Sequence, residues 1–91
     1  MTAVERTAAA TEVTAARLLG AATQAGMTIS GDLRVSEKEA AKLLGYAAGY
    51  LKKMRQEGRA PKHYTRGVGG GRISYRFDDI AAWIEARRED W

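Results

Sequence analysis

The sequence predicts a mainly α-helical fold with one small β-hairpin, and three features of the chain lead to this prediction. Apolar residues recur at helical spacing in the stretches 36–45 and 47–57. A period of two replaces that spacing at 72–77, which is typical of a strand with one buried face. Helical spacing then returns after residue 78. With 91 residues, the chain has room for one domain.

The first 32 residues are expected to form an extension ahead of a domain at 33–91. This stretch is rich in Ala and Thr, and several of its apolar residues share one narrow helical stripe. The stripe comprises Ala15, Leu18, Leu19 and Ala22. Gly20 and Gly26 are expected to interrupt or end the helix. We therefore expect an Ala-rich extension that is partly disordered or carries one short helix, which packs on the domain or on a second subunit.

Both ends of a helix are marked between Ser36 and Gly45. Ser36 followed by Glu39 has the form of a capping box, in which each side chain bonds the backbone N–H of the other residue. Val35 and Ala40 stand where a hydrophobic staple is expected. Gly45 is suited to the positive φ angle that commonly ends a helix. The stretch predicts a short helix with a marked start and a marked end.

A second helix is expected after a turn at 45–47, and it stops at Gly58, with Pro61 shortly beyond. Helical spacing places Leu51 and Met54 inward. The opposite face is polar and basic, and it carries Gly49, Lys52, Lys53 and Gln56. Two short helices joined by a turn that contains glycine are typical of a helix-turn-helix. An ordinary helical hairpin with solvated lysines is the alternative.

The segment 72–77 is expected to form a half-buried strand. The inward-facing residues are Ile73, Tyr75 and Phe77, and the outward-facing residues are Arg72, Ser74 and Arg76. Residues 62–66 can pair with this strand as a hairpin across the glycine-rich loop 67–71. A small hairpin that follows a helix-turn-helix is the wing of a winged helix.

A last helix is expected after Asp78 and Asp79, whose carboxylates are suited to capping its first turn. Its inner stripe, at i, i+3, i+4 and i+7, comprises Ile80, Trp83, Ile84 and Arg87. Trp83 is expected in the core. The complete layout is mainly α with a small β-hairpin, in the order of a winged helix-turn-helix preceded by an extension.

The positive charge of the chain lies in its middle. The formal net charge is +4, and residues 33–80 hold eleven basic and five acidic residues. The flanking stretches, 1–32 and 81–91, are each slightly acidic. An excess of positive charge on one segment favours a nucleic-acid partner met by that segment, and a solvated charged surface is the alternative.

No catalytic site, metal site or cofactor is expected. The chain has no Cys, and His63 has no second His and no nucleophile arranged around it in the sequence. The glycine run 67–71 lacks the Lys-Ser/Thr of a phosphate-binding loop and leads into a strand. No apolar run is long enough to span a membrane. Glu5 and Glu12 in the first 25 residues argue against a signal peptide.

The stretch from Val35 to Arg87 resembles the winged helix-turn-helix domains of the MerR superfamily, and particularly the small excisionase and AlpA-like proteins. The matching segments are 36–45, 57–61 and 71–84. The resemblance implies that the second helix enters the major groove of DNA and that the wing touches the adjacent minor groove or its phosphates. These families usually cap the second helix with Ser or Thr, whereas Ala47 stands there in this chain. Loss of such a cap typically costs about 1 kcal/mol.

Carried over residue by residue, the resemblance gives two sets of DNA-binding positions. The positions on the recognition helix are Ala48, Gly49, Lys52, Lys53 and Gln56. The positions on the wing and its flanks are Arg59, Lys62, Arg66 and Arg72.

An excisionase would bind and bend double-stranded DNA and direct an integrase towards excision, in the cytoplasm of a bacterial or phage-infected cell. Its small reading surface leads us to expect several copies side by side on DNA. The alternatives are an AlpA-like transcription regulator, a protein like a terminase small subunit, and a protein-interaction module in which the extension is the working part. A terminase subunit normally carries a long oligomerisation helix after the domain, and few residues follow Arg88, which disfavours that alternative.

Overall fold

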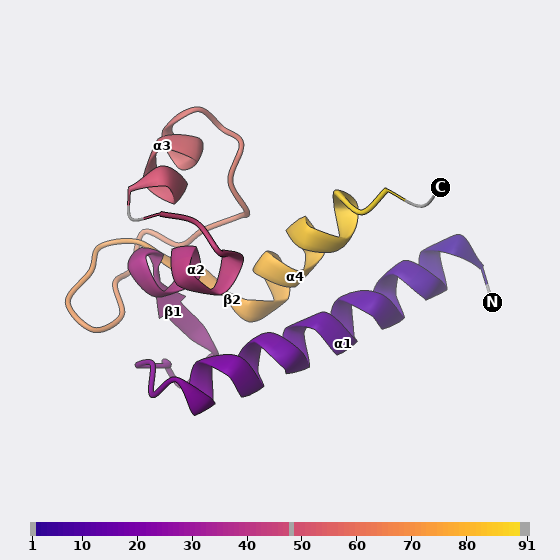
Figure 1. Ribbon diagram of the computed structural model, residues 1–91, viewed down its shortest axis with the longest axis horizontal. Helices are drawn as coiled ribbons and strands as arrows, with labels where there is room; N and C mark the ends of the chain where they lie inside the picture. Colours follow the sequence, from indigo (N-terminus) through magenta and orange to yellow (C-terminus); the bar gives the residue numbers. More distant parts are fainter. Residues whose placement is uncertain (1, 48, 90–91) are drawn as a thin grey trace.

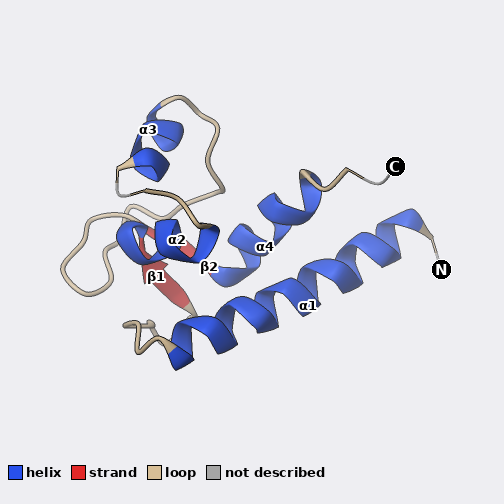
Figure 2. Cartoon of the chain, in the orientation of Figure 1, coloured by secondary structure: helices blue, strands red, loops and turns tan. Residues whose placement is uncertain are grey.

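The computed structural model describes residues 2–47 and 49–89 (Figure 1). In chain order the elements are α1 (Ala3–Gln24), β1 (Arg34–Ser36), α2 (Glu37–Leu44), α3 (Tyr50–Gln56), β2 (Ser74–Arg76) and α4 (Phe77–Ala86). The two strands pair antiparallel, and the helices lie around this small sheet (Figure 2). The predicted fold class, mainly α with a small antiparallel β element in winged helix-turn-helix order, is confirmed.

α1 is longer than the short helix expected in the extension. Thr2 caps it, because the Thr2 hydroxyl accepts the N–H of Glu5 at 3.2 Å and the Glu5 carboxylate accepts the N–H of Thr2 at 3.1 Å. The helix runs through Gly20 and ends before Gly26, whose φ angle is +70°. A glycine inside a helix costs about 1 kcal/mol relative to alanine, and the tertiary packing of the helix offsets this cost.

α1 packs along α4, and its C-terminal half reaches the core (Figure 1). Leu18 and Ala22 are buried within the same apolar cluster as the domain residues. The Thr14 hydroxyl donates to the Glu85 carboxylate at 2.9 Å and so joins α1 to α4. α1 therefore forms one wall of the folded unit. The division of the chain at residue 32 stays a prediction.

α2 begins and ends where the sequence predicts. The Ser36 hydroxyl accepts the N–H of Glu39 at 3.2 Å, so the Ser36 half of the capping box is confirmed. Gly45 ends the helix with a φ angle of +76°, a left-handed conformation that favours glycine. Val35 and Ala40, the two expected staple residues, are fully buried.

The main partner of β2 is β1, and not the segment that precedes the wing loop. The facing pairs are Arg34 with Arg76, Val35 with Tyr75, and Ser36 with Ser74. The expected hairpin strand 62–66 contributes one bridge, in which Tyr64 and Ser74 exchange backbone hydrogen bonds of 2.8 and 3.0 Å. The wing is consequently a loop closed by that bridge. β1 leads directly into α2, and β2 leads directly into α4. Pairing of β1 with β2 therefore brings the apolar faces of both helices into one core, and this burial favours β1 over 62–66 as the partner of β2.

Ser74 departs from the predicted alternation, and Phe77, buried as predicted, lies beyond the strand. Ser74 is fully buried, whereas the alternation predicts an exposed side chain. The Ser74 hydroxyl donates to the carbonyl oxygen of Arg66 at 2.5 Å and accepts from Nη1 of Arg34 at 2.8 Å. Phe77 is the first residue of α4 rather than part of the strand. The wing loop covers the face that the alternation assigns to solvent, and its backbone satisfies the buried hydroxyl.

α4 starts directly at the end of β2, so the predicted capping by Asp78 and Asp79 is wrong. Arg76 occupies the N-cap position, and both carboxylates lie within the first turn, where they interact favourably with the helix dipole. Trp83 is half-buried rather than enclosed in the core, and its Nε1–H donates to the Arg59 carbonyl oxygen at 3.1 Å. Arg87 follows the helix, with its guanidinium carbon 4.1 Å from the centre of the Trp83 ring.

The core lies where both strands meet the helices. Its largest fully buried apolar side chains are Tyr75, Phe77, Leu51, Ile80 and Val35. They come from β1, β2, α3 and α4, and α1 adds Leu18 to the same cluster. Burial of such side chains is the dominant favourable contribution to folding.

We predict that Leu18→Ala destabilises the protein, because it opens a cavity between α1 and the rest of the core. The expected loss is about 2–3 kcal/mol, which lowers the thermal midpoint by roughly 10 °C. Val13→Ala is the matched control on the same helix, since Val13 is 49% exposed, and it should change stability by less than about 0.5 kcal/mol. Thermal and urea unfolding measure both. Equal stability of the two variants would mean that α1 does not support the fold.

Candidate nucleic-acid interface

The second helix of the helix-turn-helix is shorter than predicted. α3 starts at Tyr50, and the turn before it extends to Gly49, which is the N-cap residue and has a φ angle of +84°. The prediction that Ala47 occupies the cap position is therefore wrong. A left-handed N-cap suits glycine, and its lack of a side chain means that the helix start has no side-chain cap. Ala48, predicted to lie at the DNA groove, is outside the described residues.

The two faces of α3 are divided as the sequence predicts. Leu51 is fully buried and Met54 is 5% exposed. The opposite face is open to solvent, and the exposed residues assigned to DNA there are Gly49, Lys52, Lys53 and Gln56. α3 therefore packs on the core through its apolar face, and its basic face is exposed to solvent.

The wing loop is anchored at its root and at its middle. The Arg66 carbonyl oxygen accepts from the Ser74 hydroxyl and, at 3.3 Å, from Nη1 of Arg34. Val68, in the middle of the loop, is 7% exposed. Gly67 lies so close to the Gly71 carbonyl that a Cβ atom there would overlap it. The glycine run thus allows the two limbs of the loop to touch.

Arg34 is a buried structural residue that the sequence analysis did not single out. Its guanidinium is fixed by the Asp32 carboxylate, with Nε–Oδ2 at 2.8 Å, and it lies 5.5 Å from the centre of the Tyr64 ring. The hydrogen bond from Arg34, with a second from the Ser30 hydroxyl, holds the pKa of Asp32 well below its usual range. Arg34 thereby joins β1 to the root of the wing.

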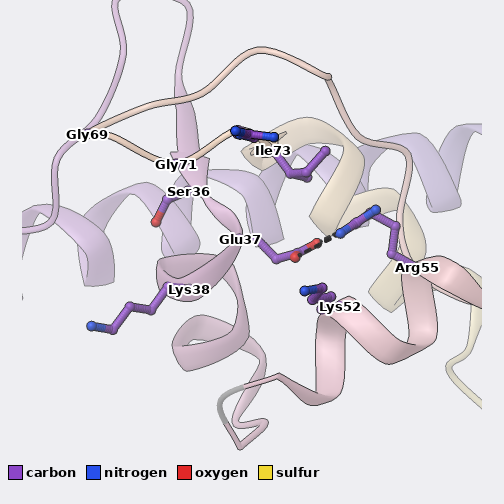
Figure 3. A pocket seen from close by; sticks show the side chains of 9 residues that line it. Ser36, Glu37, Lys38, Lys52, Arg55, Gly69, Gly71 and Ile73 are labelled. Atoms are coloured by element: carbon purple, nitrogen blue, oxygen red, sulfur yellow. Dashed lines mark hydrogen bonds and ion pairs between the residues drawn. The ribbon is translucent and has the colours of Figure 1, made fainter.

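A groove of about 520 Å³ lies between α2, α3 and the wing loop (Figure 3). Its cationic lining comes from three elements, with Lys38 on α2, Lys52 and Arg55 on α3, and Arg72 on the wing. The structure therefore brings together one predicted residue of the helix, Lys52, and one of the wing, Arg72. Sequence reasoning assigned neither Lys38 nor Arg55 to DNA. Lys38 belongs to another helix, so only the tertiary structure brings it to this groove.

Glu37 and Arg55 form an ion pair inside this groove, as the dashed line in Figure 3 marks. Arg55 Nε donates to Glu37 Oε2 at 2.7 Å, and Arg55 Nη2 donates to Oε1 at 3.3 Å. The hydroxyl of the buried Tyr75 also donates to Oε2, at 2.7 Å. Burial raises the pKa of the Glu37 carboxyl, but these hydrogen bonds lower it more, so the net pKa is below its ordinary value.

Arg59 and Lys62, predicted at the flanks of the wing, lie apart from this groove. Arg59 pairs with Glu57 through an Nη2–Oε1 contact of 2.6 Å, and both side chains are about half exposed. Lys62 lines a separate hollow against Asp79 and Trp83 of α4. Arg66 is exposed on the wing, near its root, and is not among the residues that line the groove.

Two findings concern the other predicted absences. Among residues 2–47 and 49–89, no group of His, Asp and Glu side chains is arranged to hold a metal ion. In the same part of the chain, no helix combines the length and the apolar character needed to cross a membrane.

The fold and its exposed basic helix define a small helix-turn-helix DNA-binding protein. Residues 35–88 match the model of a family described as a helix-turn-helix domain, and this stretch is more than half of the chain. The protein belongs to that helix-turn-helix domain family. Comparisons with curated proteins and with solved structures found no match.

We predict that acid weakens the fold through the Glu37 and Asp32 carboxyls. Their pKa values are lower in the folded chain than the ordinary values of 4.5 and 3.8, so the unfolded chain binds more protons in acid. The stabilisation that these two carboxyls contribute is fully present above about pH 5. It is lost as the pH falls through their pKa values in the folded chain. Glu37→Gln should cost about 1–2 kcal/mol at pH 7 and flatten part of the acid decline.

Urea unfolding at pH 7, 5 and 3 measures this effect. Glu12→Gln, which removes a carboxylate from the exposed surface of α1, is the control and should keep the wild-type decline. An acid decline that is equally steep in Glu37→Gln would contradict the assignment to this ion pair.

Proposed function

We propose that the chain binds double-stranded DNA by placing α3 in the major groove and the wing loop against neighbouring phosphates. The observation that carries this proposal is the exposed face of α3, which offers Lys52, Lys53 and Gln56 beside the wing. Lysine suits the O6 and N7 atoms of guanine, and glutamine suits adenine. α3 therefore supplies the sequence preference in this proposal.

The distribution of ion pairs supports a phosphate-binding role for the middle of the chain. Four of its arginines, Arg34, Arg55, Arg59 and Arg76, already pair with carboxylates. The other cations of this stretch form no ion pair with any residue in 2–47 or 49–89, and they are Lys38, Lys42, Lys52, Lys53, Lys62, Arg66 and Arg72. Free cations of this kind bind DNA phosphates and release counterions.

The wing supplies the second contact in the proposal. Arg66 is exposed near its root, and Arg72 lines the groove. Lys62, and Arg59 beside its partner Glu57, are proposed as outer contacts away from the groove. The proposal also assigns Gly49, the exposed N-cap residue of α3, to the DNA backbone. Phosphate contacts of this kind set the register of the protein on the duplex and carry no sequence information themselves.

We further propose that the protein acts as an excisionase, which bends DNA and directs an integrase towards excision. A seven-residue reading helix makes few base contacts, so several copies side by side on DNA are needed for a specific site. The integrase performs the strand chemistry in this proposal, and the protein acts in the cytoplasm of a bacterial or phage-infected cell. An AlpA-like transcription regulator is the second candidate, since the same family match and the same interface serve an operator equally well.

We predict that Lys52→Ala/Lys53→Ala weakens binding to duplex DNA and makes it less dependent on salt. Each lost phosphate contact lowers the slope of log affinity against log salt by about 0.9, so two lost contacts lower it by about 1.8. Fluorescence anisotropy on a random duplex at several salt concentrations measures both quantities. Unchanged affinity and slope would contradict the placement of α3 in the groove.

Arg6→Ala/Arg17→Ala is the matched control, because it also removes two exposed positive charges, from α1. It should leave the slope nearly unchanged. A wild-type protein that fails to bind duplex DNA even at low salt would refute DNA binding itself.

The excisionase proposal predicts that integrase-catalysed excision in a purified reaction depends on addition of this protein. It also predicts that the DNA length protected from DNase increases in equal steps as successive copies of the protein bind. The DNA should also bend, which fluorescence energy transfer between labelled duplex ends detects. A footprint on a promoter operator, together with no effect on excision, would favour the regulator.

A further inference from the structure

The ion pair between Glu37 and Arg55 leaves part of the Arg55 guanidinium free. An arginine side chain carries five N–H donors, and the two hydrogen bonds to Glu37 use the Nε–H and one N–H of Nη2. The Nη1 group takes part in neither bond. The side chain is 20% exposed and lines the groove, so these remaining donors are within reach of a ligand there.

The surroundings of Arg55 in the groove are cationic. Lys38 on α2, Lys52 on α3 and Arg72 on the wing line the same groove. Figure 3 labels Lys38 and Lys52. Glu37 is the one carboxylate among the described lining residues, and Arg55 and Tyr75 already occupy its oxygens. A ligand in this groove therefore meets a surplus of positive charge, which suits an anion.

Tyr75 makes the ion pair rigid. Its ring is fully buried in the core, and its hydroxyl donates to the same Glu37 oxygen that accepts from Arg55 Nε. Glu37 is thus held from two sides and in turn holds the guanidinium. A guanidinium that is already held in place loses less conformational freedom when it binds a ligand.

We propose that this groove seats one backbone phosphate of the bound DNA, with Arg55 as its principal ligand and Glu37 and Tyr75 as the residues that position Arg55. Lys38, Lys52 and Arg72 line the same groove and add positive charge to it. The inference rests on the DNA binding proposed above and adds a phosphate site between α3 and the wing. Arg55 remains charged in this site, since the hydrogen bond that it donates to Glu37 raises its pKa.

The double variant Glu37→Gln/Arg55→Gln tests the site without changing the net charge of the protein. Long-range attraction to DNA is therefore preserved, and only the local contact is lost. We expect affinity for a random duplex to fall about tenfold, the equivalent of one charge-assisted contact. The slope of log affinity against log salt should fall by about 0.9. Wild-type affinity and slope in this variant would overturn the proposal.

Glu12→Gln/Arg17→Gln is the matched control, since it removes the same two charges from exposed positions on α1. Its affinity and slope should equal those of the wild type. Thermal unfolding of both variants, measured alongside, identifies the temperature range in which each is folded. If the test variant does not fold, Arg55→Lys replaces it. Lysine keeps the positive charge but lacks the planar guanidinium group with its several N–H donors. We therefore expect the slope of log affinity against log salt to be kept and affinity to fall severalfold. Unchanged affinity would overturn the proposal.

Tyr75→Phe separates positioning from simple support of the fold. It leaves the ring in the core and removes the hydroxyl that holds Glu37. Positioning predicts weaker DNA binding with an unchanged salt slope in the folded variant, because Arg55 keeps its charge and loses its fixed orientation. A lower melting temperature with wild-type affinity would overturn the positioning role. Failure of the wild type to bind any duplex would instead refute the proposed function, so the two failures are distinguishable.

Discussion

The three residues of β2 hold the structure together, because each one connects a different part of the molecule. Ser74 bonds Tyr64 through its backbone and Arg66 through its hydroxyl, which closes the wing. Tyr75 fills the core with its ring and reaches the ion pair of α2 and α3 with its hydroxyl. Arg76 faces the β1 residue Arg34 and precedes the first residue of α4. The wing, the recognition helix and the last helix are therefore positioned from one short strand.

The positive charge of residues 33–80 is divided between arginines that pair with carboxylates and cations that pair with none of the described residues. Arg34, Arg55, Arg59 and Arg76 pair with carboxylates, and Arg34 and Arg76 also lie against the ring of Tyr64. The planar guanidinium group of arginine is suited to ion pairs with carboxylates at partly buried positions. The lysines of the same stretch extend into solvent. A modest net charge is thus enough for DNA binding, because the carboxylates that form ion pairs, Asp32, Glu37 and Glu57, pair with arginines and leave the lysines on the outer face of α3 free.

α1 and α3 lie against different sides of the domain. α1 packs along α4 and closes the core there, while α3 projects from the opposite side (Figure 1). Trp83 links the two sides, because it sits on α4 and donates to the backbone just beyond α3. The ring of Tyr46, in the turn, contacts Trp83 and Tyr50 edge to face, with centroids at 6.4 and 5.0 Å. Packing on α4 is thereby connected to both ends of the recognition helix.

The ends of α2 and the division of α3 into two faces could be predicted from the sequence alone. Ser36 and Gly45 mark the ends of α2 through bonds and angles that involve only neighbouring residues, and the spacing of Leu51 and Met54 identifies the buried face of α3. The exposed lysines of the candidate interface follow from that same spacing. These features are short-range, so the sequence contains all the information that determines them.

The tertiary structure alone decided which distant segments meet. The alternation at 72–77 predicted a strand but not its partner, and β1 outcompeted 62–66 because its pairing also joins α2 to α4. The same pairing buried Ser74 and brought Tyr75 to the ion pair that faces the groove. Each of these contacts joins residues more than thirty positions apart or depends on such a contact. The local spacing of residues does not predict these contacts, because they depend on the burial of a core that distant segments share.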